Sequence, residues 1–166
     1  VTMEMVFIKP GSFVMGGEST KDGRFACVEV PKHEVSITQG FYLGKYEVTQ
    51  AQYETIMGSN PSRSTKNPEC PVDNVGAPDA VTFCGKLAEI TGRDARLPTE
   101  AEWEYASRGG QNSKWFFGND PSKMDEFAWS KSNAGGKSHP VGEKKANPWG
   151  LYDLYGNVCE RISDNY

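Results

Sequence analysis

The segment from Gly150 to Glu160 constrains this chain most, because it places two carboxylates around a glycine turn. Asp153 and Glu160 flank the Gly156-Asn157 pair, which favours a sharp turn. Hard cations such as calcium take carboxylate and carbonyl oxygens from short, turning loops. On spacing alone, a calcium loop and a solvated turn both stay open.

The composition is that of an ordinary globular chain, and the length of 166 residues predicts a single domain over 1–166. A net charge of -4 and a pI near 5.3, without a basic stripe, argue against a nucleic-acid partner. No apolar run approaches the roughly 18 residues of a membrane span, so no transmembrane segment is expected. A leader peptide or lipid anchor removed ahead of Val1 stays open.

The four cysteines do not have the spacing of a metal site. Cys27, Cys70, Cys84 and Cys159 form no Cys-x-x-Cys pair, so a zinc site is not expected. Disulfides and buried thiols both stay open, and the position of Cys84 on an apolar helix face favours a thiol there.

Alternating apolar residues predict short antiparallel strands near the start of the chain, at 3–8, 13–15, 35–37 and 41–43. Pro10-Gly11 is expected to turn between the first two strands.

Capping signals predict three helices. Thr49 followed by Gln52 forms a capping box for a helix that ends near Met57, and Thr99 with Glu102 forms another. Between them, a helix over 78–91 carries an apolar stripe of Ala80, Phe83, Cys84, Leu87 and Ile90. The stretch 111–147 is rich in Gly, Asn, Ser and Pro with interleaved aromatics, which indicates long loops pinned by buried rings. The fold class expected is therefore α+β.

Five blocks of sequence resemble the formylglycine-generating (sulfatase-modifying factor) family. The most specific is Arg96-Leu-Pro-Thr-Glu-Ala-Glu-Trp-Glu-Tyr-Ala106, and the others lie at 10–16, 45–50, 58–62 and 150–158. The resemblance runs over the whole chain. It implies the family's variant of the C-type lectin-like fold, with short antiparallel strands, few helices and many ordered loops.

The family includes oxidases that convert a sulfatase cysteine to formylglycine, as well as ligand-binding branches. The resemblance places the oxidase's copper-holding cysteine pair beyond Tyr166, in about a third of the family domain that this chain does not contain. None of the four cysteines matches that pair, so copper is not supported by this chain and no catalytic residue is assigned.

Calcium carries over from the family better than copper does. The resemblance implies a site made by the side chains of Asp153 and Glu160 and the carbonyl groups of Gly156 and Val158. A second family site matches Asn133 and Ala134, but its acidic partner has no counterpart in this chain.

The last residues depart from the family pattern, with three tryptophans lost within seven positions. Every replaced residue is encoded by changing only adenines of an asparagine codon, which is the substitution spectrum of a diversity-generating retroelement. The positions concerned are Cys159, Arg161, Ile162, Ser163 and Asn165. A variable ligand-binding surface and neutral replacement in a divergent homologue are both open.

These observations predict a calcium-stabilised module that binds a protein or a small ligand at its surface. The alternative is a formylglycine-generating oxidase whose cysteine-bearing C-terminal part lies outside this chain. Both functions suit an extracytoplasmic or cell-surface location, although the sequence does not fix the compartment.

Overall fold

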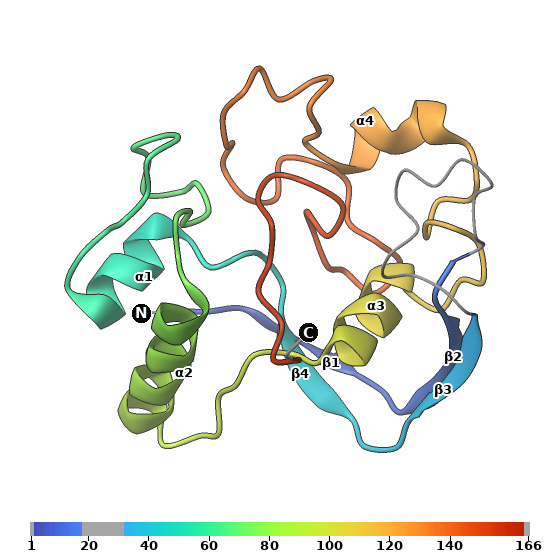
Figure 1. Cartoon of the computed structure of the whole chain (residues 1–166), viewed down its shortest axis with the longest axis horizontal. Coiled ribbons are helices and arrows are strands. Elements are labelled where there is room, and N and C mark those ends of the chain that lie inside the picture. The colour runs from blue at the N-terminus through green and yellow to red at the C-terminus, as the bar shows by residue number, and fades with distance from the viewer. Residues whose placement is uncertain (1, 18–31, 165–166) are drawn as a thin grey trace.

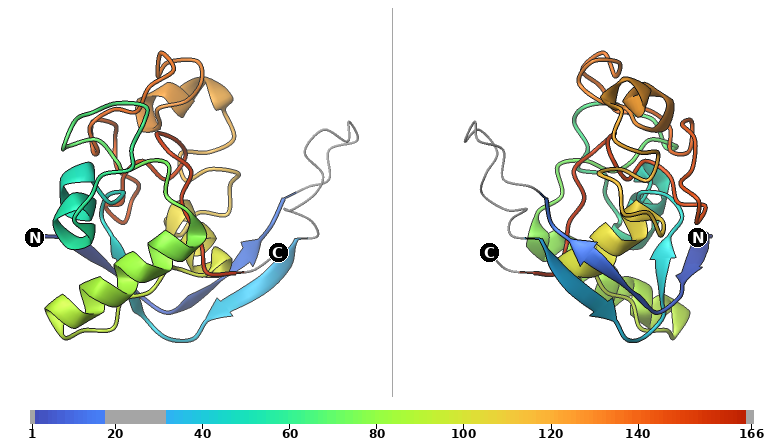
Figure 2. Two further views of the ribbon diagram at one scale, coloured as in Figure 1. Left: turned by 60° about the vertical axis from the view of Figure 1, so that its left-hand side comes forward. Right: turned by 90° about the vertical axis from the view of Figure 1, so that its right-hand side faces the viewer.

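The computed structural model describes residues 2–17 and 32–164, so Cys27 and Asn165 lie outside the described residues. Its strands form two separate antiparallel pairs (Figures 1 and 2). β1 (Met5–Ile8) pairs with β4 (Phe41–Gly44), and β2 (Gly11–Met15) pairs with β3 (His33–Ile37). The four expected strands are confirmed, although β1 begins at Met5 and β2 takes in Gly11, which was expected to lie in the turn.

The three expected helices are present with the caps that the sequence indicated. In α1 (Gln50–Met57) and α3 (Glu100–Arg108), the capping threonine accepts a hydrogen bond from the third helical amide, and the Gln or Glu side chain there bonds back. α2 (Ala77–Thr91) begins one residue before Pro78, after Gly76. All three helices end at a glycine in the left-handed conformation.

The apolar stripe of α2 is confirmed over its first three turns and wrong at its end. Ala80 and Phe83 are buried, and Cys84 and Leu87 pack against the same cluster. Ile90 is 68% exposed, because no described element covers the last turn of the helix.

The stretch 111–147 contains more regular structure than the expected loops. A 3₁₀ turn, η1 (Pro121–Lys123), leads directly into the short α4 (Met124–Phe127). The aromatics expected to be buried are half-buried instead, although they do pack together: Phe116 and Phe117 lie against Phe127 with centroid distances of 4.9 and 4.7 Å. Asp120 caps the 3₁₀ turn by accepting from the Ser122 amide, a local signal hidden in a glycine-rich and proline-rich context.

Two apolar clusters hold these elements together. The first packs α3 against β1 and β2, with Tyr105, Ile8 and Phe13 among its buried members. The second joins α1 and α2, where the Tyr53 and Phe83 rings stack at 5.4 Å. Figure 1 shows α1 and α2 at one side, α3 next to the strands, and the last segment of the chain descending between them. None of the described helices is long and apolar enough to cross a membrane.

Candidate functional site

The turn at 153–157 is built by close backbone approaches. The Gly156 amide donates to the Asp153 carbonyl at 3.0 Å, and the Asn157 amide donates to the Trp129 carbonyl at 2.7 Å. A Cβ atom at position 156 would overlap the Trp129 carbonyl oxygen, so only glycine fits. Asp153 and Asn157 both adopt positive φ angles, 60° and 73°, which Asp and Asn tolerate better than most residues. The turn is therefore fixed against the loop that carries Trp129.

Glu47 ties this turn to the segment that follows β4. Its carboxylate accepts from the Val158 backbone amide at 3.0 Å and from the Asn157 side-chain amide at 2.8 Å. Glu47 is 8% exposed. The bonds span over a hundred positions of sequence, so the geometry of the last segment depends on Glu47.

Three carboxyl groups lie around the turn, and burial raises the pKa of each. Burial raises the pKa of Glu47 well above its usual value, the Glu160 charge adds to the rise, and the bond from Val158 opposes it. Burial likewise raises the pKa of Asp153, against the hydrogen bond that the Gly142 amide donates to its Oδ2 at 2.7 Å. Such a concentration of negative charge favours the binding of a cation.

Glu160 is an exposed residue that lines a pocket, where neighbouring protein atoms partly desolvate its carboxyl group. This desolvation raises the pKa of Glu160 to about 7, the Trp103 indole lowers it, and the Asp153 charge raises it further. The Trp103 Nε1 atom is buried and makes no hydrogen bond of normal geometry with any described residue. The indole N–H therefore lies near enough to the Glu160 carboxyl group to lower its pKa, but outside the geometry of a hydrogen bond.

Among the residues expected to hold calcium, Asp153 has a carboxylate oxygen that suits a hard cation. Asp153 is 2% exposed, and its Oδ1 is buried without a hydrogen-bond partner among the described residues. A buried carboxylate oxygen without a donor calls for a cation or a proton. No group of three or more His, Cys, Asp or Glu side chains in 2–17 and 32–164 is arranged to hold a metal ion. The expected site has only two carboxylates, and its other ligands are the carbonyl groups of Gly156 and Val158.

Internal hydrogen bonds use the oxygens expected at the second calcium site. The Asn133 side-chain oxygen accepts from the Ser130 amide at 2.7 Å, and the Ala134 carbonyl lies 2.9 Å from Nε2 of His139. The His139 ring stacks on Trp129 at a centroid distance of 3.7 Å. In this structure Asn133 and Ala134 hold a loop together.

The replaced positions after the turn present side chains on a backbone that is held at both ends. Cys159, Arg161 and Ser163 are exposed and Ile162 is half-buried, whereas Asn165 lies outside the described residues. The Ser163 amide donates to the Pro98 carbonyl at 2.9 Å, and Arg161 Nε donates to the Val75 carbonyl at 3.3 Å.

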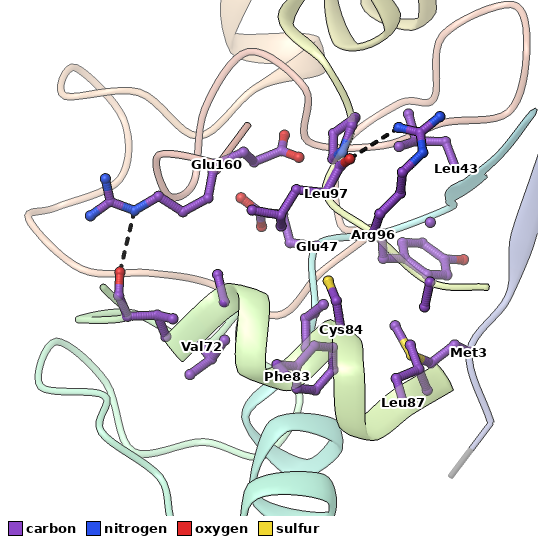
Figure 3. A pocket seen from close by; sticks show the side chains of 18 of the residues that line it. Met3, Leu43, Glu47, Val72, Phe83, Cys84, Leu87, Arg96, Leu97 and Glu160 are labelled. Carbon is purple, nitrogen blue, oxygen red and sulfur yellow. Dashed lines mark hydrogen bonds between the residues drawn. The ribbon is translucent and has the colours of Figure 1, made fainter. Parts of the chain in front are cut away.

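A pocket of about 680 Å³ opens beside this segment (Figure 3). Figure 3 shows the Glu47 and Glu160 side chains reaching into it, opposite Phe83, Cys84 and Leu87 of α2. Cys159 and Arg161 also line it. The pocket has the size and mostly apolar lining of small-molecule sites.

The described cysteines are free thiols. Cys70 is buried, Cys84 is half-buried in the pocket wall, as an apolar helix face predicts, and Cys159 is exposed. Burial raises the pKa of the Cys84 thiol, which keeps it in its unreactive protonated form.

Sequence reasoning missed Glu47 and the pocket. Glu47 lies in the block 45–50, and an acid between Tyr46 and Val48 in a half-buried stretch is a signal for a buried carboxylate. The pocket could not be found from sequence because its walls come from residues far apart in the chain.

Comparison with known proteins confirms the family. The family model "Sulfatase-modifying factor enzyme 1-like domain" matches residues 1–166. Among solved structures, "Treponema denticola variable protein 1" superposes with a TM-score of 0.81 and 29% identity, over 95% of this chain and 71% of that one. The fold is thus the α+β C-type lectin-like fold of formylglycine-generating enzymes, and the chain belongs to the family of sulfatase-modifying-factor domains.

Two curated relatives show how broad this family is. "Chaperone protein LppX" of Paenibacillus barcinonensis is 33% identical over 210 residues, which cover 96% of this chain and 71% of the relative. "Formylglycine-generating enzyme" of Mycobacterium tuberculosis is 42% identical over 101 residues, covering 54% of this chain. The match spans only 32% of that enzyme's length.

Proposed function

We propose that this chain is a ligand- or protein-binding module on the formylglycine-generating-enzyme scaffold. Calcium would stabilise the turn through the Asp153 and Glu160 side chains and the carbonyl groups of Gly156 and Val158. The binding surface would be diversified at the positions that depart from the family pattern, namely Cys159, Arg161, Ile162, Ser163 and Asn165.

The proposal rests on one observation: in the last segment the backbone is anchored while the side chains are exposed. The backbone at Val158 and Ser163 is anchored by hydrogen bonds to Glu47 and Pro98, while the side chains at 159, 161 and 163 are exposed. Side chains on an anchored backbone can change without loss of the fold, as binding loops on rigid scaffolds do.

The comparisons support a binding role in two ways. The similar solved structure is named a variable protein, which fits diversified positions. One relative that matches over nearly all of this chain is named a chaperone, a class of protein that binds other proteins. We propose by analogy that this chain also binds a partner through its surface.

The chemistry of the oxygen atoms at the turn supports the proposal of calcium. Asp153 Oδ1 is a buried acceptor without a donor, and the carboxylates around it repel one another. A calcium ion there would satisfy that oxygen and neutralise the excess charge.

A display library tests whether the segment is a binding surface. Positions 159, 161, 162, 163 and 165 would be randomised and the library selected against immobilised lysozyme. We expect folded binders, with melting temperatures within a few degrees of the parent, because the described side chains among them, at 159, 161, 162 and 163, belong to no core cluster.

A matched library would randomise five exposed α2 positions at 81, 82, 86, 89 and 90. The segment library should yield more binders than the α2 library, since it borders the pocket. A segment library that unfolds the protein, or that yields no more binders than the α2 library, would contradict the proposal.

The second candidate function is oxidation of a cysteine to formylglycine, favoured by the 42% identity to a formylglycine-generating enzyme. Incubating the full-length protein with copper, oxygen and a cysteine peptide tests it, with conversion of thiol to aldehyde read by mass spectrometry. Aldehyde formation would establish the oxidase activity. An unchanged peptide, in an assay where a known formylglycine-generating enzyme converts the same peptide, would leave binding as the single proposed function.

A further inference from the structure

The pocket beside the last segment lies between the two apolar clusters of the fold. Leu154 and Leu43 line it from the side of the first cluster, and Phe83 and Leu87 line it from the side of the second. The two apolar walls enclose a pocket of about 680 Å³, so hydrocarbon surface is left in contact with water. A ligand with an apolar body would remove that contact.

The charges around the pocket are strongly unbalanced. Among the described residues that line it, two are cationic, Arg96 and Arg161, and five carry carboxyl groups: Glu47, Asp73, Asp94, Glu102 and Glu160. Arg96 is engaged by Glu102 through two hydrogen bonds of 2.7 and 2.6 Å, and Arg161 Nε is directed to the Val75 carbonyl. The pocket therefore keeps an excess of negative charge.

Glu47 and Glu160 carry this excess into the pocket, where both side chains point into the same space above α2 (Figure 3). The hydrogen bonds to Glu47 come from Val158 and Asn157, which are neutral donors. No described residue forms an ion pair with Glu160. A cation placed between the two carboxyl groups would favour their ionised forms, against the burial that raises the pKa of both.

We propose that this pocket binds a small apolar molecule that carries a protonated amine. Its ammonium group would lie between Glu47 and Glu160, and its hydrocarbon part would lie on the face of α2 formed by Phe83 and Leu87. The inference rests on the proposed binding function and assigns a ligand class to the pocket alone.

A set of three matched probes tests this assignment. The full-length protein, in EDTA to remove competing cations, is titrated with 4-phenylbutylammonium, 4-phenylbutan-1-ol and 4-phenylbutyrate, and binding is followed by methyl NMR shifts. We expect the ammonium to bind about tenfold more tightly than the alcohol, because one desolvated charge pair contributes about that much affinity. The carboxylate should bind more weakly than either.

Two variants separate the charge from other effects. Glu160→Gln should reduce the affinity for the ammonium probe to that of the alcohol and leave the alcohol unaffected. Glu89→Gln, at an exposed α2 position that does not line the pocket, makes the same change in net charge and should have no effect. Equal binding of ammonium and alcohol to the parent protein would overturn the proposal, and so would tight ammonium binding that survives Glu160→Gln.

Contacts on the parent protein keep the proposal testable if Glu160→Gln fails to fold. Intermolecular NOEs should connect the phenyl protons of the bound ammonium probe to Leu87 and Met3. Absence of binding by all three probes would overturn the pocket assignment, while binders from the randomised segment would still support the broader function. Absence of both would contradict the binding function itself.

Discussion

The Glu47 carboxylate accepts a hydrogen bond from the Val158 amide at 3.0 Å and so joins the segment after β4 to the last turn of the chain. Both acids near this contact, Asp153 and Glu160, act on the pKa of Glu47. The same carboxylate thus anchors the proposed binding segment and forms part of the charged pocket wall.

Glu47→Ala should destabilise the protein by about 2 kcal/mol, because the half-buried Val158 amide would lose the acceptor that the buried Glu47 carboxylate supplies. Urea unfolding measures the change. Glu4→Ala is the matched control, since the Glu4 side chain is 59% exposed and forms a surface ion pair with Lys45, and it should change the stability by less than about 0.5 kcal/mol. Equal effects of the two substitutions would show that Glu47 is no anchor.

Gly156→Ala should cost about 2 kcal/mol or more, because the added methyl group would overlap the Trp129 carbonyl oxygen and the backbone would have to shift. Gly85→Ala, in the middle of α2 with open space around its Cβ position, should instead stabilise the protein by roughly 0.5–1 kcal/mol. Thermal and urea unfolding would report both. A neutral Gly156→Ala would mean that the turn is not packed against Trp129.

Arg96 holds the pKa of Glu102 below its usual value through their paired hydrogen bonds. Because the folded pKa is depressed, the pair stabilises the protein above the unfolded value of 4.5, and this contribution is lost as the pH falls through the folded pKa. Arg96→Gln should cost about 0.5–1 kcal/mol at pH 7, since the Arg96 side chain is exposed.

Urea unfolding of parent and Arg96→Gln across the acid range measures this difference, which should vanish once Glu102 is protonated in both states. The control is Arg93→Gln, an exposed arginine in the same loop. A difference that persists at low pH would assign the role of Arg96 to packing.

Local signals predicted the helices well. The capping boxes at Thr49 and Thr99 and the glycine stops need only neighbouring residues, so the bounds of α1 and α3 follow directly from the sequence. α4 was missed because its four residues have no apolar period to read, and Ile90 was misassigned because helical spacing alone does not show where the packing partner ends.

The candidate site was only partly predictable for the same reason. Asp153, Gly156 and Glu160 lie in one short stretch, so their proximity could be expected. Glu47 joins them through contacts across most of the chain, which only the folded structure reveals.

The central claim is that a calcium-held turn supports a replaceable surface, and the calcium response of the melting temperature tests it most directly. With calcium at about 100 times its dissociation constant, binding should add about 2.7 kcal/mol, a rise of roughly 5–10 °C over the value in EDTA. Asp153→Asn should abolish this rise. The double variant Cys159→Ser, Arg161→Ser should keep it in full, because these exposed side chains supply no calcium ligand. A parent protein that melts at the same temperature in calcium and in EDTA would contradict the account, as would a double variant that loses the response together with Asp153→Asn.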